Sequence, residues 1–302
     1  MKNSQYDFLA VGLSSAIQKT VVFDTFHEGE VNRSSLYFRD ASGKAVNVCR
    51  VLTQAGKGVI CLTIAGEENR SDFEELCFRD SLNVSSVLIP GRVRICTTVL
   101  NREKNICTEL VVEEPEEATI EAEDDLKNIF LRRLEENPEC LIISGSRKKG
   151  FSDQIIPYMI GKAKEKGLTV IADFRGSDLI NSCISEAIRP DYIKINEEEF
   201  FQTFPGYDDL VQGAREQSEK YNCSFIITRG ARSTLVMEKG VLTHIESKLI
   251  DAVNPIGCGD SMTAGMAQGI AEGRPLIEAV ELGRDYATRN ALSIHPGWIL
   301  ED

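Results

Sequence analysis

The sequence lacks several short motifs that mark common classes of enzyme. It has no GxxxxGK[ST] stretch, which argues against a P-loop kinase, and no GxGxxG after a predicted strand, which argues against a Rossmann dinucleotide site. It also has no GxSxG element, the nucleophile turn of the α/β-hydrolases. Its histidines, His27, His244 and His295, have neither helical metal spacing nor a nearby cysteine, so no zinc site is expected.

Long apolar runs and cysteine pairs are missing as well. No window approaches the roughly 18 apolar residues of a membrane-spanning helix, and the N-terminal segment MKNSQYDFLAVG lacks the apolar core of a signal peptide. The nine cysteines form no CxxC pair, and an odd number spread through apolar segments indicates reduced thiols. We therefore expect a cytoplasmic protein with no membrane partner.

Basic residues are fewer than acidic ones. The formal net charge of −13, from 47 acidic and 34 basic residues, argues against nonspecific binding to nucleic acid or to an anionic membrane. With 302 residues, 42% hydrophobic and 27% charged, the chain has an ordinary globular composition and can bury a large core as one or two domains.

What the chain does contain is an alternation of two kinds of segment. Short apolar runs predict buried strands at 8–11, 59–64, 141–144, 169–172, 192–195 and 225–228. Helical patterns lie between several of them, at 45–55, 72–80, 121–136, 153–166 and 210–221. This rhythm predicts βαβ units, an α/β fold and a mostly parallel sheet.

Two parts of the chain break this rhythm. Residues 19–23 with 35–39, and residues 93–101 with 105–112, alternate like antiparallel strands joined by turns. A βα unit separates the two parts in sequence. We therefore expect both to leave one core and to pair into a small second sheet over the site.

The most informative stretch is DAVNPIGCGDSM, residues 251–262. It runs from a predicted strand end through Gly257 and Gly259 into a helix that begins with an acid, Asp260. A helix N-terminus attracts anions, and glycines allow a ligand to approach the backbone closely. Asp260 could deprotonate a substrate hydroxyl beside amides that hold a transferring phosphate; alternatively, it is only a helix-capping acid.

Extended to Gly265, this stretch resembles the C-terminal signature of the ribokinase/PfkB-type carbohydrate kinases, most of all their fructose-1-phosphate and tagatose-6-phosphate kinase branch. Further blocks similar to that branch follow the same order along almost the whole chain. They are GEVNR (29–33), SGKAVNVCRVL (42–52), RIC (94–96), TEL (108–110), SGS (144–146), IKINEEE (193–199) and TRGA (228–231).

The resemblance implies a fold and a reaction. The fold is a ribokinase-like three-layer α/β/α core with a mostly parallel sheet and a small β-sheet lid, in one domain over 1–302 with a discontinuous lid at about 17–41 and 92–113. The reaction is ATP-dependent and uses Mg²⁺, and it transfers the γ-phosphoryl group to a hydroxyl of a sugar phosphate, as in a 1-phosphofructokinase or tagatose-6-phosphate kinase. The exposed face of such a lid could also pair two chains into a homodimer.

The resemblance also implies roles for individual residues. Asp260 is the general base, and the amides of Gly257, Cys258 and Gly259 form an anion hole. The nucleotide is expected at Lys194, Asn196, Thr228 and Gly230, and Mg²⁺ at Asn196 and Glu199, through water. The acceptor is expected at Gln18, Ser42, Gly43, Lys44, Asn47, Arg94 and Ser146.

Some of these residues also have interpretations that do not involve the active site, and one could have a different chemistry. Asn196 and Glu199 fit a helix capping box, a role that is compatible with metal binding. Lys44 alone would be read as a surface lysine. Cys258, near a helix N-terminus, could be a reactive thiol, but a small spacer beside the amides is the preferred interpretation.

The sequence departs from the family pattern at the acceptor end. Gln18 stands where an acid is usual, Ser42 and Ala45 replace glycines, and the segment 147–149, RKK, is basic. One hypothesis is an acceptor more anionic than a simple hexose phosphate; the alternative is neutral substitution and a solvated loop. A kinase for another sugar, a sugar acid or a nucleoside, and a non-catalytic sugar or nucleotide sensor, are the competing functions.

Overall fold

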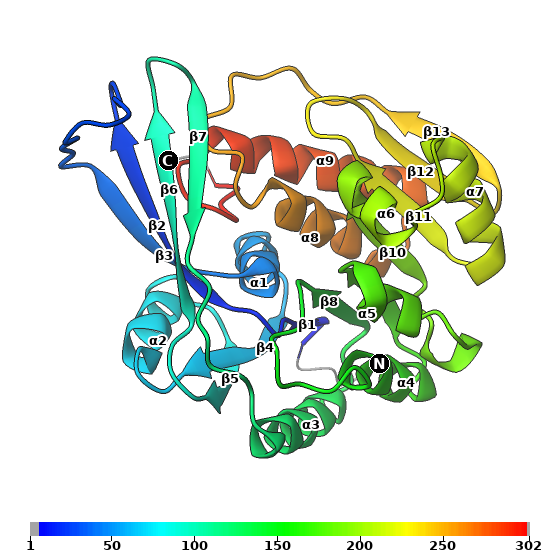
Figure 1. Ribbon diagram of the computed structural model, residues 1–302. Coiled ribbons are helices and arrows are strands. Elements are labelled where there is room, and N and C mark those ends of the chain that lie inside the picture. The colour runs from blue at the N-terminus through cyan, green and yellow to red at the C-terminus, as the bar shows by residue number, and fades with distance from the viewer. Residues whose placement is uncertain (1–5, 301–302) are drawn as a thin grey trace.

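The computed structural model describes residues 6–300, in which helices cover both faces of one large sheet (Figure 1). The strands of this nine-stranded sheet are β1 (Phe8–Val11), β4 (Val59–Gly66), β5 (Val84–Ile89), β8 (Cys140–Ser144), β9 (Thr169–Asp173), β10 (Tyr192–Asn196), β11 (Ser224–Thr228), β12 (Thr234–Glu238) and β13 (Val241–Ile245). Their spatial order is β13-β12-β11-β10-β9-β8-β1-β4-β5. Strands β11, β12 and β13 pair antiparallel at one edge, and the other neighbours are parallel, which confirms the predicted mostly parallel sheet.

Two apolar cores lie on opposite faces of this sheet. Along β1, Leu9 and Val11 join one core, and Phe8 and Ala10 join the other, as the two-residue period of a strand requires. The first core includes residues of α3 (Ile120–Leu134), α4 (Ile155–Glu165), α5 (Gly176–Asn181), α6 (Glu197–Thr203) and α7 (Leu210–Tyr221). The second includes residues of α1 (Lys44–Gln54), α2 (Arg70–Arg79), α8 (Cys258–Ala271) and α9 (Leu276–Leu292). The three-layer α/β/α prediction is thus confirmed.

The strands and helices predicted from periodicity are all present, within about three residues at their ends. Strands β5, β12 and β13 were not predicted. The sequence signal for the β12–β13 hairpin was the pair Lys239–Gly240 between two apolar runs, and in the structure this two-residue turn takes φ values of 49° and 77°. Two successive positive φ values are typical of a type I′ hairpin turn.

The second sheet is the expected small one, and it rises from the side of the core (Figure 1). Its strands are β2 (Ala16–Phe23), β3 (Tyr37–Ser42), β6 (Arg94–Asn101) and β7 (Ile106–Val111), in the order β3-β2-β6-β7. The outer pairs are antiparallel as expected, but the central pair, β2 with β6, is parallel. Both strands leave the carboxyl edge of the core, after β1 and β5, so they must run in the same direction. The assignment of 1–302 to one domain with a lid at about 17–41 and 92–113 stays a prediction.

The chain shows further features relevant to its setting. Within residues 6–300, no helix combines the length and the apolar character needed to cross a bilayer. The nine cysteines all fall within this part of the chain and are free thiols, most of them buried. The cytoplasmic location stays a prediction, and five residues of the N-terminal segment read for a signal peptide lie outside the described residues.

Candidate active site

A cavity of about 610 Å³ lies where the second sheet (β2, β3, β6 and β7), the predicted lid, meets the carboxyl ends of the core strands. Residues far apart in the sequence converge on it from α1, α6, α8, β2, β6 and β10. Fourteen of the predicted site residues line it: Gln18, Ser42, Gly43, Lys44, Asn47, Arg94, Lys194, Asn196, Glu199, Thr228, Gly230, Gly257, Gly259 and Asp260. The structure therefore brings the predicted base, anion hole, nucleotide and acceptor residues into one site.

Asp260 lies in the first turn of α8 and is only 7% exposed. The side-chain amide of Asn47 donates to its Oδ2 atom at 2.7 Å. Burial and the nearby carboxylate of Asp173 raise the pKa of Asp260 above its ordinary value, although Lys44 and the bond from Asn47 act in the opposite direction. A carboxylate with a raised pKa accepts a proton more readily, as a general base must.

The turn before Asp260 packs against the segment around Gly297 and the side chain of Asn290. Gly257, the N-cap of α8, has φ 85°, and a Cβ atom there would lie 2.6 Å from the amide nitrogen of Gly297. The side chain of Asn290 joins the two segments: its Nδ2 atom donates to the carbonyl of Ile256 at 2.8 Å, and its Oδ1 atom accepts from the amide of Gly297 at 2.5 Å. Only glycine fits this position, because both the conformation and the space exclude a side chain.

Asp173, a residue without a predicted role, pairs with two lysines that line the cavity, Lys44 and Lys194. It is the last residue of β9 and has no exposed surface. Burial alone would raise the pKa of Asp173, but Lys194 and Lys44 outweigh it and hold that pKa well below the usual range. The hydroxyls of Ser144 and Thr263 also donate to this carboxylate, at 3.0 and 2.9 Å. A buried strand that ends in an acid at the carboxyl edge was a signal that could have identified it.

The sequence profile of the pfkB family carbohydrate kinases matches residues 9–294. The chain belongs to this family. It is therefore a carbohydrate kinase, a phosphotransferase that acts on an alcohol group, and the resemblance seen in the sequence is confirmed.

Individual relatives agree with this assignment. Two tagatose-6-phosphate kinases from strains of Staphylococcus epidermidis are each 27% identical to this kinase, over 97% of its length and 95% of theirs. The structure of Escherichia coli phosphofructokinase-2 in complex with fructose-6-phosphate has a TM-score of 0.82 at 18% identity, over 95% of this chain and 94% of that chain. A possible 1-phosphofructokinase of Thermotoga maritima has a TM-score of 0.84 at 21% identity, over 95% and 92% of the two chains. These structures confirm the ribokinase-like fold.

Two predicted residues, both within the described part of the kinase, lie outside the cavity lining. The thiol of Cys258 accepts a bond from Asn290 at 3.3 Å, and its amide donates to the carbonyl of Pro255 at 3.3 Å. Burial raises the pKa of Cys258 to about 11, which favours the spacer interpretation over a reactive thiol. Ser146 lines a neighbouring cavity of about 530 Å³, which meets the first cavity at Arg94.

The departures from the family pattern occupy different places in this kinase. Gln18 is 2% exposed, and its amide donates to the hydroxyl of Thr98 at 2.7 Å, so it joins β2 to β6 inside the lid. Arg147 donates to Asp178 at 3.0 Å and to the carbonyl of Phe151. Its loop lines the neighbouring cavity rather than the one that holds Asp260. The basic loop is therefore partly neutralised and set apart from the base.

The residues expected to organise a metal form a helix cap. The side chain of Asn196 accepts from the amide of Glu199 at 2.8 Å, and the Oε2 atom of Glu199 accepts from the amide of Asn196 at 3.0 Å. The remaining oxygen of Glu199, Oε1, lies 3.5 Å from the ammonium of Lys44. The capping role is therefore confirmed, and the other carboxylate oxygen of Glu199 faces Lys44.

Proposed function

We propose that this kinase transfers the γ-phosphoryl group of ATP to a hydroxyl of a sugar phosphate, as tagatose-6-phosphate kinases and 1-phosphofructokinases do. The observation that carries the proposal is the buried carboxylate of Asp260 at the glycine turn of α8, in the same cavity as Lys44 and Arg94. A base, backbone amides and cations are what phosphoryl transfer needs from a protein. The names of the Staphylococcus relatives support a ketose phosphate as acceptor.

In this mechanism, Asp260 accepts the proton of the attacking hydroxyl. The amides of Gly257 and Gly259 hold the oxygens of the transferring group at the N-terminus of α8, where the helix dipole favours negative charge. The amide of Cys258, predicted as a third donor, does not join them, because it already donates to the carbonyl of Pro255. The nucleotide lies along Lys194, Asn196, Thr228 and Gly230. The acceptor lies along Gln18, Ser42, Gly43, Lys44, Asn47 and Arg94, with Ser146 in the adjoining cavity.

Members of this family use ATP, typically with Mg²⁺, and the donor set of the site fits this ion. Among residues 6–300, no group of three or more His, Cys, Asp or Glu side chains could hold a metal by itself. Mg²⁺ usually keeps several waters and takes one or two carboxylates beside substrate phosphates, so Glu199 with Asn196 would hold it through water. When bound, the ion neutralises charge on the phosphate oxygens.

A coupled ADP-release assay with a panel of acceptors tests the proposal. We expect turnover of fructose 1-phosphate or tagatose 6-phosphate, abolished by Asp260→Ala. Asp285→Ala, which removes a half-exposed acid of α9, is the matched control and should keep full activity. Turnover only of a non-phosphorylated sugar, a sugar acid or a nucleoside would reject the acceptor class. Binding without turnover would favour a sensor, and unchanged turnover in Asp260→Ala would reject the mechanism.

We also propose that the lid pairs two chains into a homodimer. The lid exposes large apolar side chains that a monomer would leave in water: Tyr37, Ile95, Ile106, Leu110, Val111 and Val112. Light scattering should give a mass near twice that of the 33.5 kDa chain, and Leu110→Glu should halve it. The control is Val241→Glu, which places the same charge on an exposed residue of β13, outside the lid, and should leave the mass unchanged. A wild-type monomer at micromolar concentration would reject the dimer.

A further inference from the structure

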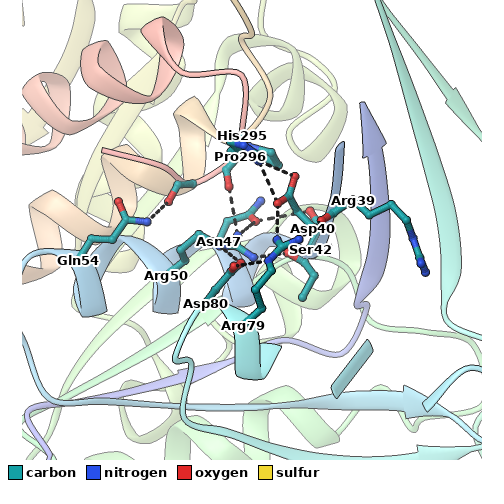
Figure 2. Close-up of polar contacts among 12 residues, drawn as sticks. Arg39, Asp40, Ser42, Asn47, Arg50, Gln54, Arg79, Asp80, His295 and Pro296 are labelled. Atoms are coloured by element: carbon teal, nitrogen blue, oxygen red, sulfur yellow. Dashed lines mark hydrogen bonds and ion pairs between the residues drawn. The ribbon is translucent and has the colours of Figure 1, made fainter. Parts of the chain in front are cut away.

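A buried cation lies directly behind the active site. Arg50, on α1, is only 1% exposed, although a guanidinium is always charged. Its Nε atom donates to Asp80 at 3.0 Å, and its other nitrogens donate to Asn47, to the carbonyl of Pro296 and to the carbonyl of Ala41 (Figure 2). Such a charge is retained in a core only where its partners are satisfied, so each of these bonds constrains the group it reaches.

The bond to Asn47 fixes the direction of that amide. The Nη1 atom of Arg50 donates to Oδ1 of Asn47 at 3.0 Å, and the hydroxyl of Ser42 adds a longer bond of 3.4 Å. With its acceptor end held in this way, the amide turns its donor end, Nδ2, to Oδ2 of Asp260 at 2.7 Å. The reverse orientation would place the Oδ1 atom against the carboxylate and leave the guanidinium facing an NH₂ group.

We propose that Arg50 is a positioning residue of this kinase, which holds the Asn47 amide so that it donates to the base Asp260. The inference rests on the proposed role of Asp260. A bond donated to the ionised carboxylate stabilises that form, so Arg50 keeps the base deprotonated at a lower pH than burial alone would allow. The bonds of Arg50 reach Asp80, Asn47, Pro296 and Ala41 but not Asp260, so Arg50 acts on the base through Asn47.

The same guanidinium also secures the turn that carries the anion hole. Its bond to the carbonyl of Pro296, 3.1 Å long, ties α1 to the loop that includes Gly297. The amide of Gly297 in turn holds Asn290, which lies beneath the turn at Gly257. One buried residue thus links the base and the anion-hole turn to the same helix.

Other charged groups also face Asp260 and must be considered in any pH effect. They are Asp173 from β9, Lys44 from α1 and Lys194 from β10. Both lysines end on the carboxylate of Asp173, at 3.1 and 3.4 Å. These contacts do not involve Arg50, so they should persist when Arg50 is replaced.

The test compares Arg50→Met/Asp80→Asn with Arg79→Met. The double variant removes both members of the buried ion pair, so neither Arg50 nor Asp80 leaves an unpaired charge. Arg79 is the matched control, because it bonds the same Asp80 carboxylate, together with Asp40 and the carbonyl of Arg39, but these bonds do not include Asn47. Circular dichroism and thermal melting establish that each variant is folded.

The main readout is the pKa of Asp260, measured from its ¹³C carboxyl resonance and from the acidic limb of the kcat/KM profile. We expect a rise of about one pKa unit in the double variant, the size typical of a lost charge-assisted bond, and none in Arg79→Met. Below that pKa, kcat/KM should fall about tenfold relative to wild type. An unshifted pKa in the folded double variant would overturn the proposal.

A second variant covers the case in which the double variant does not fold. Arg50→Lys keeps the charge opposite Asp80, but a single ammonium cannot reach Asp80, Asn47 and Pro296 together. The pKa of Asp260 should therefore rise in this variant as well, and no rise would count against Arg50. If no acceptor is turned over by the wild type, the proposed function fails, while the NMR titration still decides the role of Arg50.

Discussion

The ammonium of Lys44 lies 3.1 Å from the carboxylate of Asp173, a group with no exposed surface. Lys194 reaches the same carboxylate at 3.4 Å from the neighbouring strand. Two cations are therefore held by one acid at the edge of the sheet where a phosphate is expected. Burial lowers the pKa of Lys44, but Asp173, Glu199 and Asp260 outweigh it and raise that pKa, so Lys44 stays charged at neutral pH.

Replacing Asp173 should destabilise the protein. In Asp173→Asn, two lysines lose a buried partner, and breaking such a pair typically costs about 3 kcal/mol. The pKa of Asp173 is lowered in the folded state, so its stabilisation is complete above the unfolded pKa of about 3.9 and is lost as the pH falls below it. Urea unfolding at pH 7 and pH 3 should therefore show a smaller pH effect in the variant. Asp285→Asn, at a half-exposed acid, should change the free energy of unfolding by less than about 0.5 kcal/mol.

Asp260→Asn should lower kcat and raise the stability of the fold at pH 7. We expect kcat to fall at least about 100-fold, as for the loss of a general base. The pKa of Asp260 is raised in the folded state, so its charge destabilises the fold above that pKa, and the penalty disappears as the pH falls below the unfolded value. The melting temperature of the variant should therefore exceed that of wild type at pH 7, and the two should converge near pH 4. A lower melting temperature at pH 7 would contradict this interpretation.

The turn at Gly257 allows a controlled test of the anion hole. Gly257 and Gly273 both have positive φ, 85° and 75°, so an alanine is strained at either position. A Cβ atom at Gly257 would also lie 2.6 Å from the amide nitrogen of Gly297, whereas at Gly273 it meets nothing within 4 Å. Gly273→Ala should cost about 1–2 kcal/mol and keep full kcat. Gly257→Ala should cost about 1–3 kcal/mol more and lower kcat about 100-fold.

Cys258 should behave as an inert spacer. Burial raises its pKa to about 11, so the thiol is almost entirely protonated at pH 7.5. Iodoacetamide at that pH should leave Cys258 unlabelled in the native protein, as measured by peptide mass spectrometry, while urea-unfolded protein is labelled. Cys258→Ala should keep kcat within about threefold. Rapid native labelling with loss of activity would instead indicate a reactive thiol.

The local parts of this fold could be predicted from the sequence because local physics dictates them. Strand β1 and the helix α7 were placed at their observed residues, since period, length and caps are properties of short segments. Asp260 was identified for the same reason: two glycines and an acid stand close together at a helix start. The strand end predicted just before them was wrong, because β13 ends at Ile245 and residues 246–257 form a loop. The order of strands at the carboxyl edge then brings the other blocks to it.

Contacts between residues far apart in the sequence could not be predicted from local patterns. The parallel pairing of β2 with β6 depends on where each strand leaves the core, and the place of Arg147 depends on Asp178, its partner 31 residues away. Arg50 lies within the family block at 42–52, but no role was predicted for it, because a single sequence does not show that a charged side chain is buried.

The family, the α/β alternation and the candidate base could be read from the chain alone, because they are encoded in residues that are neighbours along it. The groups that control that base became visible only in the folded protein. Asp173 and Asn47 reach the site of Asp260 from segments 87 and 213 residues away. Their effect depends on burial and on distances of a few ångströms, which exist only once the sheet, the lid and α8 have packed together.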